Sequence, residues 1–216
     1  LVGEPTSNEK LGDSIRVGRR GSLSGELRVK GKQGHIAYPE NVRNPIFLSS
    51  DLIVKLKNKV WDNGNAIFQP TSFQISNIAS GTGAKNVVPG HLDMVFNFRF
   101  STESTESSLR DEFESILQSL DLNYDIDWYL SGLPYLTTDS TLKDIVVNSI
   151  KKETGIDADK NAKGGTSDGR FIAKMNTEII ELGPLNKTIH QIDECVSVKD
   201  LETLKAIYLR VLKELN

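Results

Sequence analysis

The sequence predicts an α/β protein in which a ferredoxin-like βαββαβ domain is inserted into part of a second α/β domain. Two observations lead to this fold class. Between residues 21 and 134 the apolar pattern runs strand, helix, strand, strand, helix, strand, which is the order of the split βαβ fold. Residues 1–20 and 135–216 contain short apolar segments and amphipathic helices without that order, and we assign these two ranges to the second, partial domain.

A change in the spacing of apolar residues predicts the first strand and the first helix of the inserted domain. Residues 22–31 alternate apolar and polar side chains, as a half-buried strand does. Asn44 and Pro45 suit the cap and the first position of a helix, and apolar residues then recur every four positions until Asp62. We therefore expect a helix between residues 44 and 60.

The rest of the inserted domain continues the pattern. Residues 71–79 and 92–101 alternate as two strands, and the second strand has Arg99 on the face opposite its phenylalanines. Residues 109–120 have the spacing of an amphipathic helix, and residues 124–130 alternate as a last strand. The expected product is an antiparallel sheet with both helices on one face.

The flanking segments predict the remainder of an α/β domain. Residues 142–150 and 198–215 have the apolar spacing of helices, and residues 177–183 read as a short buried strand. The chain begins LVGEPTS, without an initiator methionine, and Gly3 and Pro5 punctuate the end of an apolar pair. This beginning suggests that the sequence starts within a domain.

Composition limits the function classes. The chain has 216 residues with a formal net charge of −3 and mixed signs throughout, which argues against nucleic acid as a partner. No apolar run approaches the roughly 20 residues that span a bilayer, so we expect a cytoplasmic protein with no membrane partner. Because Cys195 is the only cysteine, an internal disulfide and a thiolate-rich zinc site are excluded. Any metal must be held by histidine and carboxylates.

A glycine-rich turn at residues 164–170, GGTSDGR, is one candidate for ligand binding. Such a turn lets a ligand carboxylate approach backbone N–H groups. An equally good interpretation is a tight turn in which Asp168 caps a helix. The turn has no lysine after its last glycine, as a phosphate-binding Walker motif requires, and the chain has no G-x-S-x-G nucleophile elbow.

The histidines are the other candidates. Imidazole is the commonest metal-ligating side chain, and His190 follows a predicted strand and a GPLN turn. A hydrogen-bonded loop histidine is the alternative, and residue pattern alone favours that alternative. Glu4 is likewise more often a helix cap or a surface carboxylate than a ligand. His35 has no partner at metal-binding spacing and suits a hydrogen-bond donor or proton carrier, and His91 receives no role.

Seven segments together resemble one enzyme family. They are VGEPTS, GRRGSL, GKQGHIAYPE, NVVPG, NFRFST, GGTSDGRF and LGPLNKTIH. Their order and spacing are similar to those of the zinc aminoacylase/carboxypeptidase family, and the resemblance extends from Leu1 to the C-terminus. It implies an α/β catalytic domain, here residues 1–20 and 135–216, and an inserted lid, here residues 21–134, that forms a homodimer. The implied reaction is removal of succinate from N-succinyl-LL-2,6-diaminopimelate in lysine and cell-wall precursor biosynthesis.

The resemblance also implies a site with two bridged zinc ions. Glu4 corresponds to a terminal carboxylate ligand of one zinc, and His190 to the imidazole ligand of the other. The family's first histidine ligand, bridging aspartate, third metal carboxylate and glutamate base correspond to positions before Leu1. We therefore expect this chain to represent a C-terminal portion that has no measurable hydrolase activity alone and that binds zinc weakly at most.

For the substrate and the reaction, the resemblance implies further roles. His35 is the implied catalytic residue, which donates a hydrogen bond to the oxyanion in the partner subunit's site. The anionic substrate is contacted by Arg19, Ser22, Tyr38, Asn86, Arg99, Gly165, Thr166 and Asn186. Lys85 departs from the family pattern, which often has asparagine there. Two alternatives stay open, namely a related deacylase such as an acetylornithine deacetylase, and a non-catalytic dimerisation module.

Overall fold

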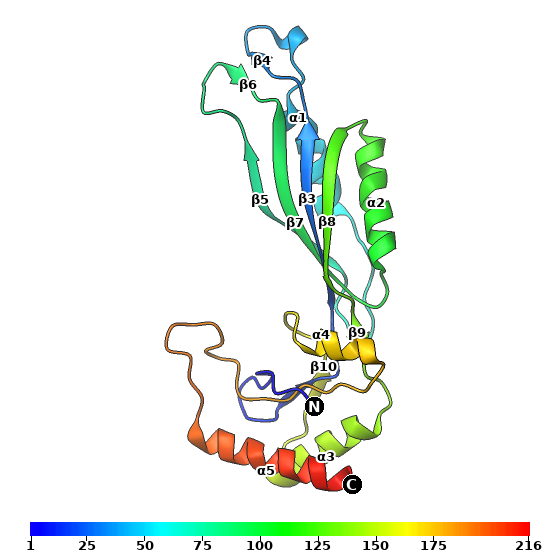
Figure 1. The fold of residues 1–216 in the computed structure, drawn as a ribbon, viewed down its shortest axis with the longest axis vertical. Helices are drawn as coiled ribbons and strands as arrows, with labels where there is room; N and C mark the ends of the chain where they lie inside the picture. The colour runs from blue at the N-terminus through cyan, green and yellow to red at the C-terminus, as the bar shows by residue number, and fades with distance from the viewer. The chain divides into compact units, whose positions relative to one another are not determined.

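A computed structural model describes residues 1–216, which form two compact units (Figure 1). The first unit comprises Leu1–Arg20, Ala66–Gln69 and Pro134–Asn216. The second comprises Gly21–Asn65 and Pro70–Leu133. No helix in either unit combines the length and apolar character that crossing a membrane requires.

The second unit is built on a four-stranded antiparallel sheet in the order β5-β7-β3-β8. Its strands are β3 (Gly21–Lys30), β5 (Ser72–Ser80), β7 (His91–Phe100) and β8 (Asn123–Gly132). Helix α1 (Pro45–Asn58) lies between β3 and β5 in sequence, and α2 (Glu106–Ser119) lies between β7 and β8. This order and pairing confirm the predicted ferredoxin-like fold.

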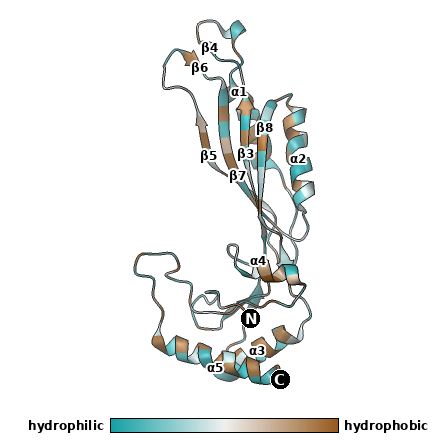
Figure 2. Ribbon diagram, in the orientation of Figure 1, coloured by the Kyte–Doolittle hydropathy of each residue, from teal (hydrophilic) through white to brown (hydrophobic).

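One face of this sheet and the two helices share a single apolar core. Phe96 and Phe98 on β7 are fully buried, and the ring of Phe96 stacks on that of Phe113 from α2 with centroids 4.5 Å apart. Leu52 and Leu56 of α1 belong to the same cluster. The hydropathy colours alternate along the strands of the sheet in Figure 2, as expected when one face is packed and the other is polar.

Both helices of the second unit begin at the residues that their sequences favour. The Asn44 side chain accepts a hydrogen bond from the N–H of Ile46 at 3.0 Å, and Pro45 is the first helical residue of α1. Thr105 and Ser108 form a capping box at the start of α2. Helix α1 ends at Asn58, so the predicted end near residue 60 is slightly late.

Asp62 does not end the helix but joins three parts of the second unit. Its carboxylate accepts hydrogen bonds from the N–H groups of Gly64 and Thr71, both at 2.8 Å, and from the hydroxyl of Ser104 at 2.6 Å. The hydroxyls of Thr71 and Ser101 also donate to it. Partial burial alone raises the pKa of Asp62, but these donors outweigh burial and lower the pKa to about 2.

The first unit has shorter strands. Strand β1 (Ser14–Arg16) pairs in parallel with β10 (Asp159–Asn161), and β2 (Gly18–Arg19) pairs antiparallel with β9 (Tyr135–Leu136). Helices α3 (Thr141–Thr154) and α5 (Val198–Glu214) pack with them around a second apolar cluster. The cluster includes Ile15, Val146, Ile150, Ile180, Leu182 and Ile207, each fully buried.

The segment that we predict as a short buried strand, residues 177–183, is buried but forms no continuous ladder. Ile180 and Leu182 have no exposed surface. The segment pairs only through single bridges of Glu181, one to Val2 and one to Arg16. Periodicity reports burial and extension, whereas a ladder also needs partner strands along the whole segment.

Candidate functional site

Glu4 and Asn186 are placed by two extended segments that run side by side in the first unit. The N–H of Val2 donates to the carbonyl of Ile180 at 2.9 Å, and the N–H of Asn186 donates to the carbonyl of Ser7 at 2.9 Å. A side chain at Gly183 would lie 2.9 Å from the carbonyl oxygen of Gly3, so this close approach needs glycine. The two segments therefore bring Glu4 near the start of the turn that leads to His190.

His190 lies on an exposed loop with an unusual backbone. Its φ is +60°, in the left-handed region that is uncommon for a residue other than glycine. The N–H of His190 donates to the Glu194 carboxylate at 3.3 Å. Thr188 and Cys195 close the loop, because the N–H of Cys195 donates to the Thr188 hydroxyl and that hydroxyl donates to the Cys195 carbonyl, both at 3.1 Å. Positive φ at such residues is often found at functional positions.

The residues of this chain do not form a complete metal site. Glu4 and His190 have the donor chemistry that zinc prefers. However, no group of three or more His, Cys, Asp and Glu side chains is arranged to hold a metal ion. Two ligands do not satisfy the tetrahedral coordination of zinc in proteins. A metal centre thus requires ligands beyond those that the structure brings together.

The glycine-rich turn begins after β10 and leads into the short helix α4 (Gly169–Ile172). Asp168 occupies the cap position of α4, as the capping interpretation expects. Its side chain, however, makes no capping hydrogen bond. Gly164 has a φ of +98°, and Gly165 and its neighbours Lys163 and Gly164 are exposed. The turn therefore presents backbone to solvent.

Arg19 points to the inner side of this turn. Its Nε donates to Glu181 at 2.8 Å, and its Nη1 donates to the carbonyls of Lys163 at 3.1 Å and Gly165 at 3.2 Å. The Arg19 side chain is 8% exposed and that of Glu181 is 0% exposed. Contact of Arg19 with substrate stays a prediction, and this geometry instead ties Arg19 to the backbone of the turn.

Two predicted substrate contacts of the second unit lie opposite each other on the polar face of its sheet. Ser22 on β3 pairs with Arg99 on β7. The amide of Asn97, two residues before Arg99, donates to the hydroxyls of Ser22 at 3.1 Å and Ser24 at 2.9 Å. Since a hydroxyl that accepts such a bond can still donate its own proton, Ser22 and Arg99 together suit an anionic group.

Three other predicted residues gather at a small two-stranded sheet of the second unit. Strand β4 (Gly34–His35) pairs with β6 (Val87–Val88), and the N–H of Ile36 donates to the carbonyl of Asn86 at 3.1 Å. The ring centroids of His35 and Tyr38 are 5.8 Å apart. The 3₁₀ turn η1 (Pro39–Asn41) follows. Their residue spacing alone did not connect Asn86 with His35.

The neutral His35 ring has a defined tautomer. The N–H of Ala37 donates to His35 Nδ1 at 3.1 Å. A backbone N–H can only donate, so Nδ1 is the acceptor nitrogen and Nε2 carries the proton. His35 in this tautomer offers an N–H donor at Nε2; its donor role stays a prediction.

The sequence analysis assigned no role to Glu181, Tyr135, Ser167 or Asn97. Glu181 accepts hydrogen bonds from Arg19, Tyr135 and Ser167. Burial, together with the bond to Glu181, raises the pKa of Tyr135 far above its usual value, so its phenol remains a donor. One signal was available, because a glutamate inside the apolar run of residues 179–182 must find buried partners.

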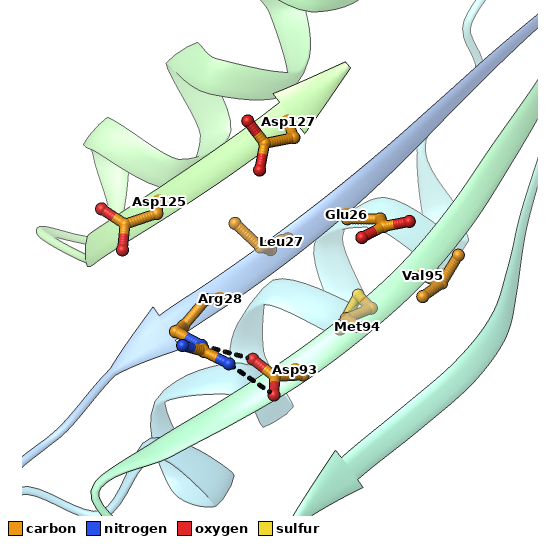
Figure 3. A pocket seen from close by; sticks show the side chains of 8 residues that line it. All are labelled: Glu26, Leu27, Arg28, Asp93, Met94, Val95, Asp125 and Asp127. Atoms are coloured by element: carbon orange, nitrogen blue, oxygen red, sulfur yellow. Dashed lines mark hydrogen bonds and ion pairs between the residues drawn. The ribbon is translucent and has the colours of Figure 1, made fainter. Parts of the chain in front are cut away.

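A hollow on the polar sheet face contains none of the predicted site residues (Figure 3). Glu26, Asp93, Asp125 and Asp127 line it, and Arg28 pairs with its cross-strand neighbour Asp93. The Nε of Arg28 donates to Asp93 at 2.7 Å and its Nη2 at 3.1 Å. This acidic surface does not suit an anionic ligand.

The family model described as peptidase dimerisation domain (M20_dimer) matches residues 17–125. The chain is 56% identical over 215 residues to a succinyl-diaminopimelate desuccinylase from Polynucleobacter necessarius, and the match covers 100% of the chain and 56% of that protein. It is 58% identical over 213 residues to the enzyme of the same name from Hydrogenovibrio crunogenus, covering 98% and 56%. The chain thus spans about half the length of these curated relatives.

Solved structures share the fold at low identity. An M20 family metallo-carboxypeptidase from Sulfolobus solfataricus has a TM-score of 0.80 at 17% identity, and the match covers 98% of this chain and 62% of that one. The aminopeptidase PepT from Bacillus cereus has a TM-score of 0.79 at 19% identity, covering 96% and 55%. These likenesses concern the fold.

Proposed function

This chain belongs to the M20 peptidase dimerisation family, and from that membership we propose that it forms part of a succinyl-diaminopimelate desuccinylase. The proposed reaction is hydrolysis of the amide of N-succinyl-LL-2,6-diaminopimelate to succinate and the free diamino acid, in the cytoplasm, for lysine and cell-wall precursor biosynthesis. The observation that carries this proposal is identity of 56% and 58% to enzymes of that name over nearly the whole chain. The activity is proposed for a full-length protein that contains this sequence.

We assign the metal of this enzyme as zinc, with Glu4 and His190 as the ligands that this chain contributes to two different ions. The carboxylate and imidazole suit zinc, and the likeness to a metallo-carboxypeptidase is consistent with a metal site in this fold. The remaining ligands must come from elsewhere, since this chain has no cluster of three ligating side chains. Residues 1–20 and 135–216 are the proposed catalytic portion and residues 21–134 the proposed lid.

The substrate carries several carboxylates, and two arrangements support its recognition. Arg99 and Ser22 combine a cation with a hydroxyl on one sheet face. Gly165 and Thr166 offer backbone from an exposed turn. Tyr38, Asn86 and Asn186 are proposed as further contacts. In this assignment Arg19 acts mainly on the turn, because its guanidinium already binds Glu181 and two carbonyls.

His35 is the proposed oxyanion donor, acting through its Nε2–H in the partner subunit's site. The bond from Ala37 to Nδ1 supports this role, because it directs the proton to Nε2 before substrate binds. A donor on the lid can reach the reacting carbonyl when the lid closes, so that donor placement and exclusion of water occur together.

The proposed homodimer forms through the second unit. Strand β5 is an edge strand, and its residues 76–80 are exposed. On α1, Phe47 is 73% exposed and Val54 is 57% exposed. An uncovered strand edge and apolar helix residues are features that an isologous contact covers. Sedimentation of this chain at micromolar concentration should show a dimer, and a monomer alone would contradict this proposal.

The chain by itself should therefore dimerise without catalysing hydrolysis. We expect no measurable desuccinylase activity and zinc binding that is weak at most, because two protein ligands do not fix a bridged pair. Metal analysis after gel filtration measures this directly. Two zinc ions bound per chain in stoichiometric amounts would be inconsistent with the assignment of only two ligands to this chain.

The activity is tested with a full-length protein that contains this sequence. Succinate release from N-succinyl-LL-2,6-diaminopimelate is measured beside acetate release from N-acetylornithine, at matched enzyme and zinc concentrations. We expect kcat/KM for the succinyl substrate to exceed that for the acetyl substrate by at least about a hundredfold. The acetyl group has no carboxylate, so the groups of the site that bind the succinyl carboxylate would be left unpaired. A preference for N-acetylornithine would assign the protein to the related deacetylases.

A further inference from the structure

The glycine-rich turn is anchored by a buried carboxylate that none of the roles above includes. Glu181 is fully buried. Its side chain accepts a hydrogen bond from Arg19 Nε at 2.8 Å and further bonds from Arg19 Nη2, the Tyr135 hydroxyl and the Ser167 hydroxyl. A carboxylate without exposure needs this many donors, because an incompletely paired buried charge is strongly destabilising.

Arg19 transmits this anchoring to the backbone of the turn. Its Nη1 donates to the carbonyls of Lys163 at 3.1 Å and Gly165 at 3.2 Å. In a trans peptide the carbonyl and the next N–H point in opposite directions. The N–H groups of Gly164 and Thr166 are therefore directed away from the guanidinium. Glu181 fixes Arg19, and Arg19 sets the orientation of these two peptide groups.

The glycines of the turn fit the same arrangement. A side-chain carbon at Gly164 would lie 2.7 Å from Arg19 Nη1, and Gly164 has a φ of +98°. A side-chain carbon at Gly169 would lie 2.9 Å from Glu181 Oε1. At Gly165 nothing lies within 4 Å of that position. The inner side of the turn is thus filled by the ion pair, while the side at Gly165 is open.

We propose that Glu181 is a positioning residue, which acts through Arg19, Ser167 and Tyr135 to hold the turn at residues 163–168 in the form that binds an anionic group of the substrate. This inference rests on the proposed function. Because Glu181 neutralises the guanidinium, the open side of the turn presents oriented peptide dipoles rather than a free cation. Such a preorganised backbone binds an anion without reorganising at each turnover.

The first arm of the test is amide hydrogen exchange of this chain, which needs no activity. In Glu181→Gln, which keeps the shape but removes the charge, the amides of residues 163–168 should exchange at least about tenfold faster, the scale of one lost bond to a charged group. Tyr135→Phe, which removes a single donor, should give a smaller change in the same residues. The matched control is Glu202→Gln, at an exposed glutamate of α5, which should change nothing in the turn.

The second arm is steady-state kinetics of the full-length protein. For Glu181→Gln and Tyr135→Phe we expect KM for the succinyl substrate to rise, and in Glu181→Gln the rise should be about tenfold. We expect kcat to stay within about threefold of wild type. This pattern is the one seen when an interaction made equally in the ground state and the transition state is lost. A purely structural role would lower the amount of active protein and leave KM unchanged. Unchanged turn exchange or unchanged KM in both variants of an active protein would overturn the inference. An inactive wild-type protein would overturn the proposed function and, with it, this inference.

Discussion

The two units hold their candidate residues in different ways. In the second unit, Ser22 and Arg99 are fixed by a continuous ladder between two ten-residue strands. In the first unit, Glu4 and Glu181 lie on segments that pair through single bridges, and side-chain bonds provide much of the order. The same chain thus positions one set of residues by a continuous strand ladder and another by a buried polar network.

The largest effect on stability should come from the apolar core of the second unit. Phe113→Ala removes a fully buried ring that contacts Phe96, and we expect a loss of about 3–5 kcal/mol in the free energy of unfolding. Hydrogen exchange should locate the loss in β3, β7 and α2. The matched variant in the first unit, Ile207→Ala, should lower protection around α3 and α5 instead. Equal loss of protection in both units from either variant would show that they do not have separate cores.

The sequence was sufficient for those parts of the molecule whose geometry is local. Alternation and four-residue spacing predicted every long strand and both helices of the second unit, because each of these elements packs one apolar face against the same core. The family resemblance is confirmed by the comparisons. Periodicity could not predict that Asn86 lies against Ile36, or that Arg19 meets Glu181, 162 positions away. Those contacts depend on tertiary placement, which residue spacing does not encode.

A polar residue should matter in the second unit only where it collects many donors. Asp62→Asn removes the charge that accepts bonds from Thr71, Ser104 and Gly64, and we expect a loss of about 2 kcal/mol in the free energy of unfolding. Urea unfolding at pH 7 measures this loss. The exposed Asp51→Asn on α1 is the control and should stay close to wild type.

The Asp62 carboxylate should also make the stability of the protein depend on pH in acid. The folded-state pKa of Asp62 is about 2, below its ordinary value of 3.8. Because folding lowers the pKa of this carboxyl, its ionised form stabilises the folded protein at pH values above the ordinary pKa. This contribution to the free energy of unfolding is lost as the pH falls from about 4 toward about 2. The stability difference between wild type and Asp62→Asn should therefore shrink over that interval. A difference that stays constant down to pH 2 would contradict the lowered pKa.

The smallest effect should come from ion pairs on the polar face of the sheet. Lys30 pairs with Asp125, with side chains 39% and 62% exposed. Such pairs contribute little because water and salt screen them, so Lys30→Gln should change the unfolding free energy by about 0.5 kcal/mol or less. A loss above about 2 kcal/mol would mean that this face is less accessible to water than its exposure indicates.

The central claim is that the second unit supplies His35 to the partner subunit, while the first unit retains the metal ligands of its own site. Its most direct test mixes full-length subunits carrying His35→Ala with subunits carrying Glu4→Ala. Each variant alone should be nearly inactive, because His35→Ala removes the oxyanion donor, which lowers turnover by about 10²–10³, and Glu4→Ala removes a metal ligand. In a mixed dimer, the subunit with His35→Ala keeps Glu4 and receives His35 from its partner, so one of the two sites is complete. After random re-pairing of equal amounts, about half the dimers are mixed, and activity should recover to roughly a quarter of wild type. Mixed dimers that form, as native mass spectrometry can show, but recover no activity would contradict the claim that His35 acts across the dimer.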